Sequence, residues 1–140
     1  MIFPMAPPPC CFANEAAQIY RHPLGFVQHV WLPGAHASAV LRAAFEALLG
    51  QLHPVGAGKV LIDQRRFVTP SAPDTSWFLL DWLPRAVQQG YRYGAVLSAG
   101  PALDRVSRHT TRQEAMRQYP IIYHRFDQES LAIAWLLAQP

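Results

Sequence analysis

The sequence has few residues that could form a covalent or metal cross-link. Its two cysteines, Cys10 and Cys11, are adjacent, and neighbouring cysteines rarely form a disulfide because the ring between them is strained. No further cysteine is present for a disulfide in the core or for a thiolate metal site. This usage is typical of a reducing compartment, and we expect a cytoplasmic protein.

Charge and long hydrophobic runs are also scarce. Charged residues make up 15% of the chain and hydrophobic residues 51%, a composition that can bury a core and argues against global disorder. Lys59 is the only lysine, so arginine supplies almost all of the positive charge behind the net charge of +3. A net charge of this size is modest evidence for an acidic partner. No apolar run reaches the ~18 residues that a membrane span requires, so we expect no membrane partner.

Prolines concentrate at the N-terminus. Residues 1–13 lack a basic start, and prolines interrupt their apolar run, so this segment is not typical of a signal peptide. We expect residues 1–16 to be a flexible, Pro-rich leader without a role that the sequence reveals. Residues 17–140 are expected to form one domain, as the chain length suggests.

The motifs of common active sites are missing. There is no Gly-x-Ser-x-Gly nucleophile elbow and no glycine-rich phosphate loop ahead of a helix. None of the six histidines stands at a metal-ligand spacing, and we expect His29 and His124 at the surface or on an edge strand. We therefore predict no catalytic residue, no metal site and no cofactor.

The most informative stretch that is present is a strand–helix–strand unit. The apolar segment Lys59–Asp63 predicts a strand buried on both sides, a helix begins near Ser71, and a second apolar strand covers about residues 93–98. Ser71 with Asp74 three positions later resembles a capping box, and Pro84 predicts a bend in the helix. Such a unit indicates a parallel sheet and the α/β class.

The flanking segments extend this unit in both directions. Before it, the pattern predicts an antiparallel hairpin and an amphipathic helix; after it, a weakly apolar helix, a strand and a final helix capped by Asp127. We therefore predict a five-stranded, mostly parallel sheet with an N-terminal antiparallel hairpin and four helices, in the order β-β-α-β-α-β-α-β-α. The flanking segments are residues 18–22, 26–32, 36–52, 101–119 and 121–126 and the final helix, with Leu131, Ala134, Trp135 and Ala138 as its buried stripe.

Three stretches carry a family likeness. They are the strand ending LIDQRRF, the segment SAPDTSWFLLDWLPRAVQQGYRYGAVLS with its Trp-x-Pro-Arg-Ala step, and FDQESLAIAWL near the C-terminus. Together with the order of the elements, they make residues 18–138 resemble STAS domains, the group that includes anti-sigma-factor antagonists. Within this group, the chain looks most like the small STAS-like (SpoIIAA-like) proteins common in bacteria. The resemblance implies helices packed on a sheet of roughly sequential strand order and a role in regulation or protein–protein contact without catalysis.

The resemblance also implies where a phosphorylation switch would lie. Antagonist STAS domains carry a phosphorylatable serine at the start of the helix after the third strand, in an Asp-Ser-Ser-Gly-like motif. The nearest match here is Asp74-Thr75-Ser76-Trp77, with a tryptophan in place of the glycine and a later position relative to the strand. Ser76 and Thr75 are the candidates for this switch, and the favoured alternative is an ordinary polar first turn of a helix.

Two further candidate surfaces lie beside this helix. Arg65 and Arg66 follow a strand at the carboxyl end of the sheet and, with Trp82, are candidates for binding a carboxylate or phosphate. The favoured alternative is an ion pair of one arginine with Asp63 or Asp81, with the other arginine solvated. Phe78 and Trp82 are expected off the inward helix face, which predicts a homodimer interface. The residues expected to face inward are Trp77, Leu80, Pro84 and Val87.

The candidate partners follow from these surfaces. Arg105, Arg108 and Arg112 form a basic stripe without interleaved aromatic residues, so we expect no specific nucleic-acid binding. The favoured function is a non-enzymatic STAS-like protein-interaction or regulatory module of unknown partner, and the alternative is a carrier of a small amphipathic anion or lipid. An apolar pocket of roughly 300 Å³ or more would favour the carrier, whereas a flat apolar patch would favour the interaction module.

Overall fold

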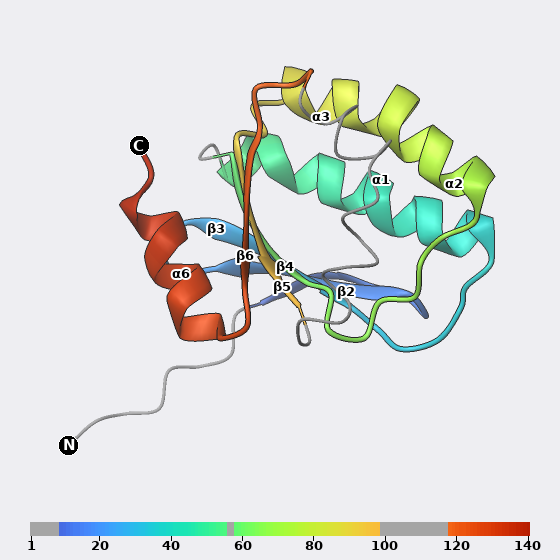
Figure 1. Cartoon of the computed structure of the whole chain (residues 1–140), viewed down its shortest axis with the longest axis horizontal. Helices are drawn as coiled ribbons and strands as arrows, with labels where there is room; N and C mark the ends of the chain where they lie inside the picture. The colour runs from blue at the N-terminus through green and yellow to red at the C-terminus, as the bar shows by residue number, and fades with distance from the viewer. Residues whose placement is uncertain (1–8, 56–57, 99–117) are drawn as a thin grey trace.

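The computed structural model describes residues 9–55, 58–98 and 118–140, in which helices cover both faces of one six-stranded sheet (Figure 1). The strands lie side by side in chain order: β1 (Cys10–Ala13), β2 (Ala17–His22), β3 (Phe26–Trp31), β4 (Lys59–Asp63), β5 (Tyr93–Leu97) and β6 (Ile122–Phe126). β1, β2 and β3 pair antiparallel, and β3, β4, β5 and β6 pair parallel. The α/β class and the parallel strands with an antiparallel hairpin are therefore confirmed.

The predicted number of five strands is wrong because β1 lies in the segment expected to be a leader. Phe12 of β1 packs against the core, and the strand pairs with β2. Asn14 builds the turn between the two strands: its side-chain oxygen accepts hydrogen bonds from the backbone amides of Ala16 and Ala17 at 2.8 and 3.0 Å. The run of prolines ends at Pro9, so the residues of β1 that follow have the backbone N–H groups that pairing with β2 requires.

Three helical segments are described. They are α1 (Ser38–Val55), the unbroken succession of α2 (Ala72–Trp77), η1 (Phe78–Trp82) and α3 (Leu83–Gln88), and α6 (Glu129–Ala138). Figure 1 shows α1 and α2–η1–α3 on one side of the sheet and α6 on the other. The predicted helix at residues 101–119, with the arginine stripe, falls almost wholly outside the described residues. In the described part of the chain, no helix is long and apolar enough to span a membrane.

Ser71 is the N-cap of α2, as predicted, although the Asp74 carboxylate bonds to the Ser71 hydroxyl and not to its backbone amide as in a full capping box. The Ser71 hydroxyl accepts a hydrogen bond from the backbone amide of Asp74 at 3.3 Å, with a proline in the first turn. Ahead of Pro84, the helix widens into the π turn η1, in which the Leu83 amide bonds to the Phe78 carbonyl. The helix thus accommodates the missing proline amide with a wide turn and without a break.

The burial of this helix overturns the prediction for its inward face. Asp74 and Phe78, one turn apart, are already buried before the π turn, and the wide turn then rotates the side chains that follow it relative to the α-helical period. Phe78 and Trp82 are 8% and 1% exposed, whereas Leu80 is 78% exposed. The expectation that Phe78 and Trp82 lie off the inward face is wrong, and with it the reason for placing a homodimer interface or a surface ligand site on them.

The core on the α1 side is aromatic. Phe45 lies at its centre, with ring centroids 5.0 Å from Trp31, 5.1 Å from Phe78 and 5.2 Å from Trp82. The Trp82 indole also donates a hydrogen bond of 2.6 Å to the Phe45 carbonyl, which satisfies the polar atom of a buried ring. Helix packing on this face is therefore fixed both by ring contacts and by a buried hydrogen bond.

His29 lies in this aromatic core, and the prediction of a surface or edge-strand residue is wrong. β3 is flanked by β2 and β4, and α1 covers the side of β3 on which Val27, His29 and Trp31 lie. Among the described residues, neither ring nitrogen of His29 has a hydrogen-bond partner. Burial lowers the pKa of His29 to about 3, so the ring is neutral at physiological pH.

Among the described residues, α6 is the helix that covers the opposite face of the sheet. Ala132 and Leu136 of α6 are fully buried against Phe26, Leu61 and Ala95. The predicted buried stripe is wrong except for the half-buried Trp135, because Leu131, Ala134 and Ala138 are exposed. Nearly every residue of this helix is apolar, so its sequence period does not determine which side faces the sheet.

Candidate functional site

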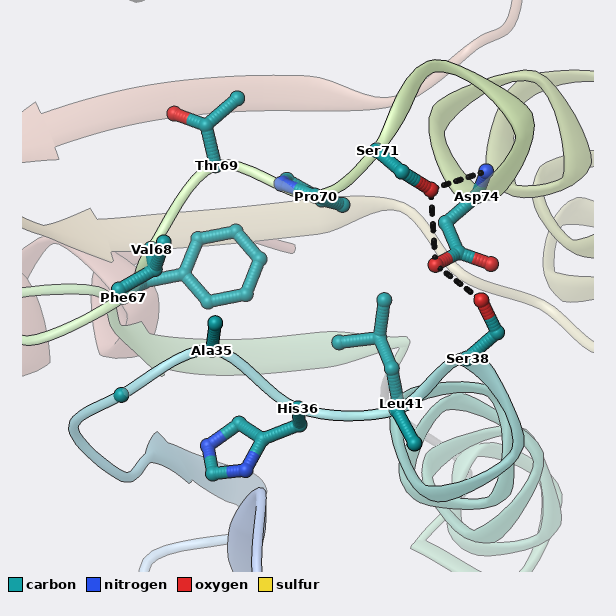
Figure 2. A pocket seen from close by; sticks show the side chains of 12 residues that line it. Ala35, His36, Ser38, Leu41, Phe67, Val68, Thr69, Pro70, Ser71 and Asp74 are labelled. Atoms are coloured by element: carbon teal, nitrogen blue, oxygen red, sulfur yellow. Dashed lines mark hydrogen bonds between the residues drawn. The ribbon is translucent and has the colours of Figure 1, made fainter.

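A hollow of about 340 Å³ opens between the segment after β3 and the segment after β4 (Figure 2). β3 and β4 are parallel neighbours, so the chain leaves both strands at the same edge of the sheet. Beyond the strands, an isolated bridge between Gly34 and Phe67 holds the two segments together. The carboxyl edge of the strands is also where α/β sheets usually place ligands.

One end of the hollow is apolar. Figure 2 shows the Phe67 ring directed toward Leu41, with Ala35 and Pro70 on either side. The Phe67 ring also lies 4.6 Å from the Trp31 ring between centroids, so the aromatic core supports this wall from behind. A small apolar group would therefore find a preformed surface here.

The other end of the hollow is polar and is organised by Asp74. Its carboxylate is 4% exposed and accepts hydrogen bonds from Ser38 Oγ at 2.8 Å, Arg42 Nε at 3.0 Å and Ser71 Oγ at 3.1 Å. Ser38 is the first residue of α1, and Ser71 is the N-cap of α2. One carboxylate thus joins the starts of two helices that cross from one parallel strand to the next.

The environment of Asp74 fixes its charge. Burial favours the neutral acid, but the hydrogen bonds from Ser38, Arg42 and Ser71 outweigh burial and hold the pKa of Asp74 below its ordinary value. Arg42 is held in turn over the Trp77 ring, with its guanidinium carbon 5.1 Å from the ring centroid. An ionised carboxylate with a lowered pKa is a weak base and is poorly suited to activate a serine hydroxyl.

The polar end offers acceptor atoms to a ligand. Ser38 and Ser71 both donate their hydroxyl protons to the same carboxylate oxygen of Asp74, so what they can present to the hollow is oxygen lone pairs. The other polar side chains of the lining contribute less: Figure 2 shows the Thr69 hydroxyl and the His36 ring directed away from its centre. The two serine hydroxyls would therefore pair with a hydrogen-bond donor of a bound molecule.

The structure does not bring the predicted ligand residues together. Arg65 forms a two-pronged ion pair with Asp63, at 3.0 and 2.8 Å, which is the alternative favoured by the sequence. Burial favours the neutral Asp63 carboxyl, but the bonds and charge of Arg65, with the charge of Arg66, lower its pKa. Arg66 is exposed, and Trp82 is buried in the core beneath Phe45. None of the three lines the hollow.

The candidate phosphorylation residues lie just past the hollow. Thr75 is half-buried and Ser76 is exposed in α2, immediately after Asp74. In the motif of the resembled family this aspartate precedes the switch, whereas here its carboxylate is committed to two serines and an arginine. Phosphorylation at Ser76 or Thr75 stays a prediction.

Sequence reasoning missed Ser38 and Phe67, although it found Ser71 and Asp74 as a cap. A usable signal was present, because a serine at the start of a helix after each of two adjacent parallel strands must fall at the same edge. Phe67 carried no such signal, since its position depends on the path of an irregular segment.

Comparisons of the chain with protein-family models, curated proteins and solved structures gave no match. Within residues 9–55, 58–98 and 118–140, no group of three or more His, Cys, Asp or Glu side chains is arranged to hold a metal ion. A function for this chain is therefore inferred from the hollow and its hydrogen-bond network.

Proposed function

We propose that this chain is a non-enzymatic, STAS-like regulatory module that binds a small amphipathic molecule in the hollow after β3 and β4. The proposal is carried by one observation: a preformed hollow of about 340 Å³ has an apolar end at Phe67 and a polar end at Ser38, Ser71 and Asp74. Its volume lies within the range of small-molecule sites and favours ligand binding over a flat contact surface as its role.

Binding without catalysis is supported by how the polar groups at the site are used. Asp74 is stabilised as an anion by three donors, and the two serines donate to it. A serine nucleophile needs a base that accepts its proton, and a carboxylate with a lowered pKa does so poorly. The network is well suited to fix the shape of the hollow and to position a ligand.

The chemistry of the ligand follows from the two ends. The apolar end fits a ring or short branched chain against Phe67, and the polar end fits a head group that donates hydrogen bonds, such as an amide, an alcohol or an amidinium. A carboxylate or phosphate head would place its lone pairs against those of Ser38 and Ser71, next to the Asp74 charge. We therefore favour a donor-headed molecule over the amphipathic anion expected from the arginines.

Three probes that differ only in the head group test this function. Benzamide, benzamidine and benzoate share one ring and carry a neutral donor, a cationic donor and an anionic acceptor. In titrations of the isotope-labelled chain followed by NMR, the first two should shift amide signals of residues 34–41 and 67–74, with a Kd on the order of 1 mM. Benzoate should bind at least about tenfold more weakly, since it lacks a donor.

A filled hollow provides the control. Ala35 is exposed and lines the hollow, so Ala35→Trp should block the probes without disturbing the core, whereas Ala43→Trp, at an exposed position of α1 outside the lining, should leave binding unchanged. If no probe binds, or if Ala35→Trp binds them as well as the native chain does, the proposed function is wrong. Benzoate binding as tightly as benzamide would refute the donor-headed class alone.

A further inference from the structure

The hollow is lined mainly by two continuous stretches of chain. Residues 34–38 form one wall and residues 67–71 the other, and Leu41 and Asp74 complete the described lining. The first stretch follows β3 and the second follows β4, and because these strands are parallel neighbours, the two walls leave the sheet side by side. A space between two such stretches has the shape that a third length of chain can occupy.

The two walls separate at Gly34. This glycine forms the isolated bridge to Phe67, and its φ of 99° lies in the left-handed region, so the chain turns out of the strand direction immediately after the bridge. The space beside it is open, since among the described residues a Cβ added to Gly34 would meet no heavy atom within 4 Å beyond its chain neighbours. Ala35 and Ala37, which follow, are small and exposed, so side chains cover little of the main chain of this wall.

Both walls carry backbone hydrogen-bond donors that remain available to a ligand. In the described part of the chain, no acceptor pairs with the backbone amides of His36, Ala37 and Thr69, all of which line the hollow. The two serine oxygens at the polar end, whose protons are committed to Asp74, are acceptors. An amidinium or ammonium group has donors alone and would leave these backbone amides unpaired, whereas an amide group has a donor and an acceptor.

We propose that the ligand of the hollow is an extended peptide segment, bound between the two walls with its main chain paired to them. The inference rests on the proposed function and names the class of its ligand. Each peptide unit carries one N–H and one C=O, so successive units match a lining that has both acceptors and donors. Alternate side chains of an extended segment point the same way, so one of them can lie against Phe67 while the main chain reaches the serine oxygens.

The two ends of the hollow set what the segment should contain. A branched apolar side chain, such as that of valine, suits the Phe67 end, and an acidic side chain is disfavoured next to Asp74. The wall from residue 34 to residue 38 would be about 13 Å long if fully extended, so about four residues of a ligand can pair with it. A contact of this length predicts weak binding, with a Kd on the order of 100 μM.

Titration of the isotope-labelled full chain with acetyl-Ala-Val-Ala-Ala-amide, followed by NMR, tests the proposal. The peptide should bind about tenfold more tightly than benzamide and should shift the amide signals of His36, Ala37 and Thr69, as expected for donors that gain an acceptor. Versions of the peptide that are N-methylated at one amide at a time keep every side chain. At least one of them should bind about tenfold more weakly, because it lacks an N–H that pairs with the walls.

A pair of variants tests the serine acceptors. Ser38→Ala should weaken peptide binding about threefold to tenfold, whereas Ala43→Ser, at an exposed position of α1 outside the lining, should leave it unchanged. If benzamide binds in the hollow but the peptide does not, or if all N-methylated forms bind as tightly as the parent peptide, the ligand is not a peptide and the proposed function stands. If neither benzamide nor the peptide binds there, the proposed function fails as well.

Discussion

The two faces of the sheet differ in how completely the chain covers them. Two helical segments, α1 and α2–η1–α3, lie on one face and bury Phe78 and Trp82 around Phe45. In the described part of the chain, the other face has the short helix α6, with buried contacts made by alanine and leucine and with leucines left exposed. The first face can supply most of the stability, whereas the second is left with a surface available for contact.

The largest expected difference between the faces comes from removing one tryptophan from each. Trp82→Ala should lower the free energy of unfolding by about 4 kcal/mol, because it empties a fully buried site and leaves the Phe45 carbonyl without its donor. Trp135→Ala should cost about 2 kcal/mol or less, since this ring is half-buried on the α6 side. Urea unfolding measures both, and equal losses would contradict the comparison.

A second comparison uses the histidines of the two faces. His29 has a pKa of about 3 when folded and an ordinary value of 6.5 when unfolded, so between these pH values the unfolded chain binds the extra proton. This group therefore removes stability as the pH falls below 6.5, by up to about 1.4 kcal/mol per pH unit.

The variants His29→Leu and His124→Leu separate this effect from other titrations. Urea unfolding at pH 7, 6 and 5 should show a shallower loss of stability for His29→Leu than for the native chain. His124→Leu, which removes an exposed imidazole from β6, is the matched control for a change of histidine to leucine. Parallel slopes for the native chain and His29→Leu would show that His29 is not buried as described.

The smallest expected effect concerns an exposed leucine of α6. Leu131→Ser should change the free energy of unfolding by about 0.5 kcal/mol or less, because the side chain is 52% exposed. Leu48→Ser, at a position 3% exposed on α1, should cost several kcal/mol, about 3. A large loss for Leu131→Ser in dilute solution would mean that the chain itself covers this residue.

The elements predicted best are those whose signals are local. The bounds of β4 and the Ser71 N-cap agree with the prediction, since an apolar run and an N-cap depend on a few adjacent residues. The inward face of the next helix was not predicted correctly. Phe78 is buried one turn after Asp74, and the π turn ahead of Pro84 then changes the period, so that Trp82 is buried and Leu80 is exposed.

The candidate site was predictable only in part, for the same reason. Asp74 was identified as a capping residue, but its bonds to Ser38 and Arg42 cross between two helices more than 30 residues apart in sequence. Arg65 and Arg66 were placed correctly after β4, yet pairing with Asp63 commits Arg65, and the hollow forms beyond both. Which side chains meet there depends on the path of two irregular segments, and no periodic pattern describes such a path.

The strictly sequential strand order has a consequence for synthesis. Each strand pairs with the strand that precedes it in the chain, so every ladder can form as soon as the next strand leaves the ribosome. Helix α6 emerges after all six strands, and until it does, Phe26, Leu61 and Ala95 lack the contacts that it makes with them. A nascent chain halted before Glu129 would therefore expose an apolar face of a nearly complete sheet. Chaperones bind surfaces of this kind.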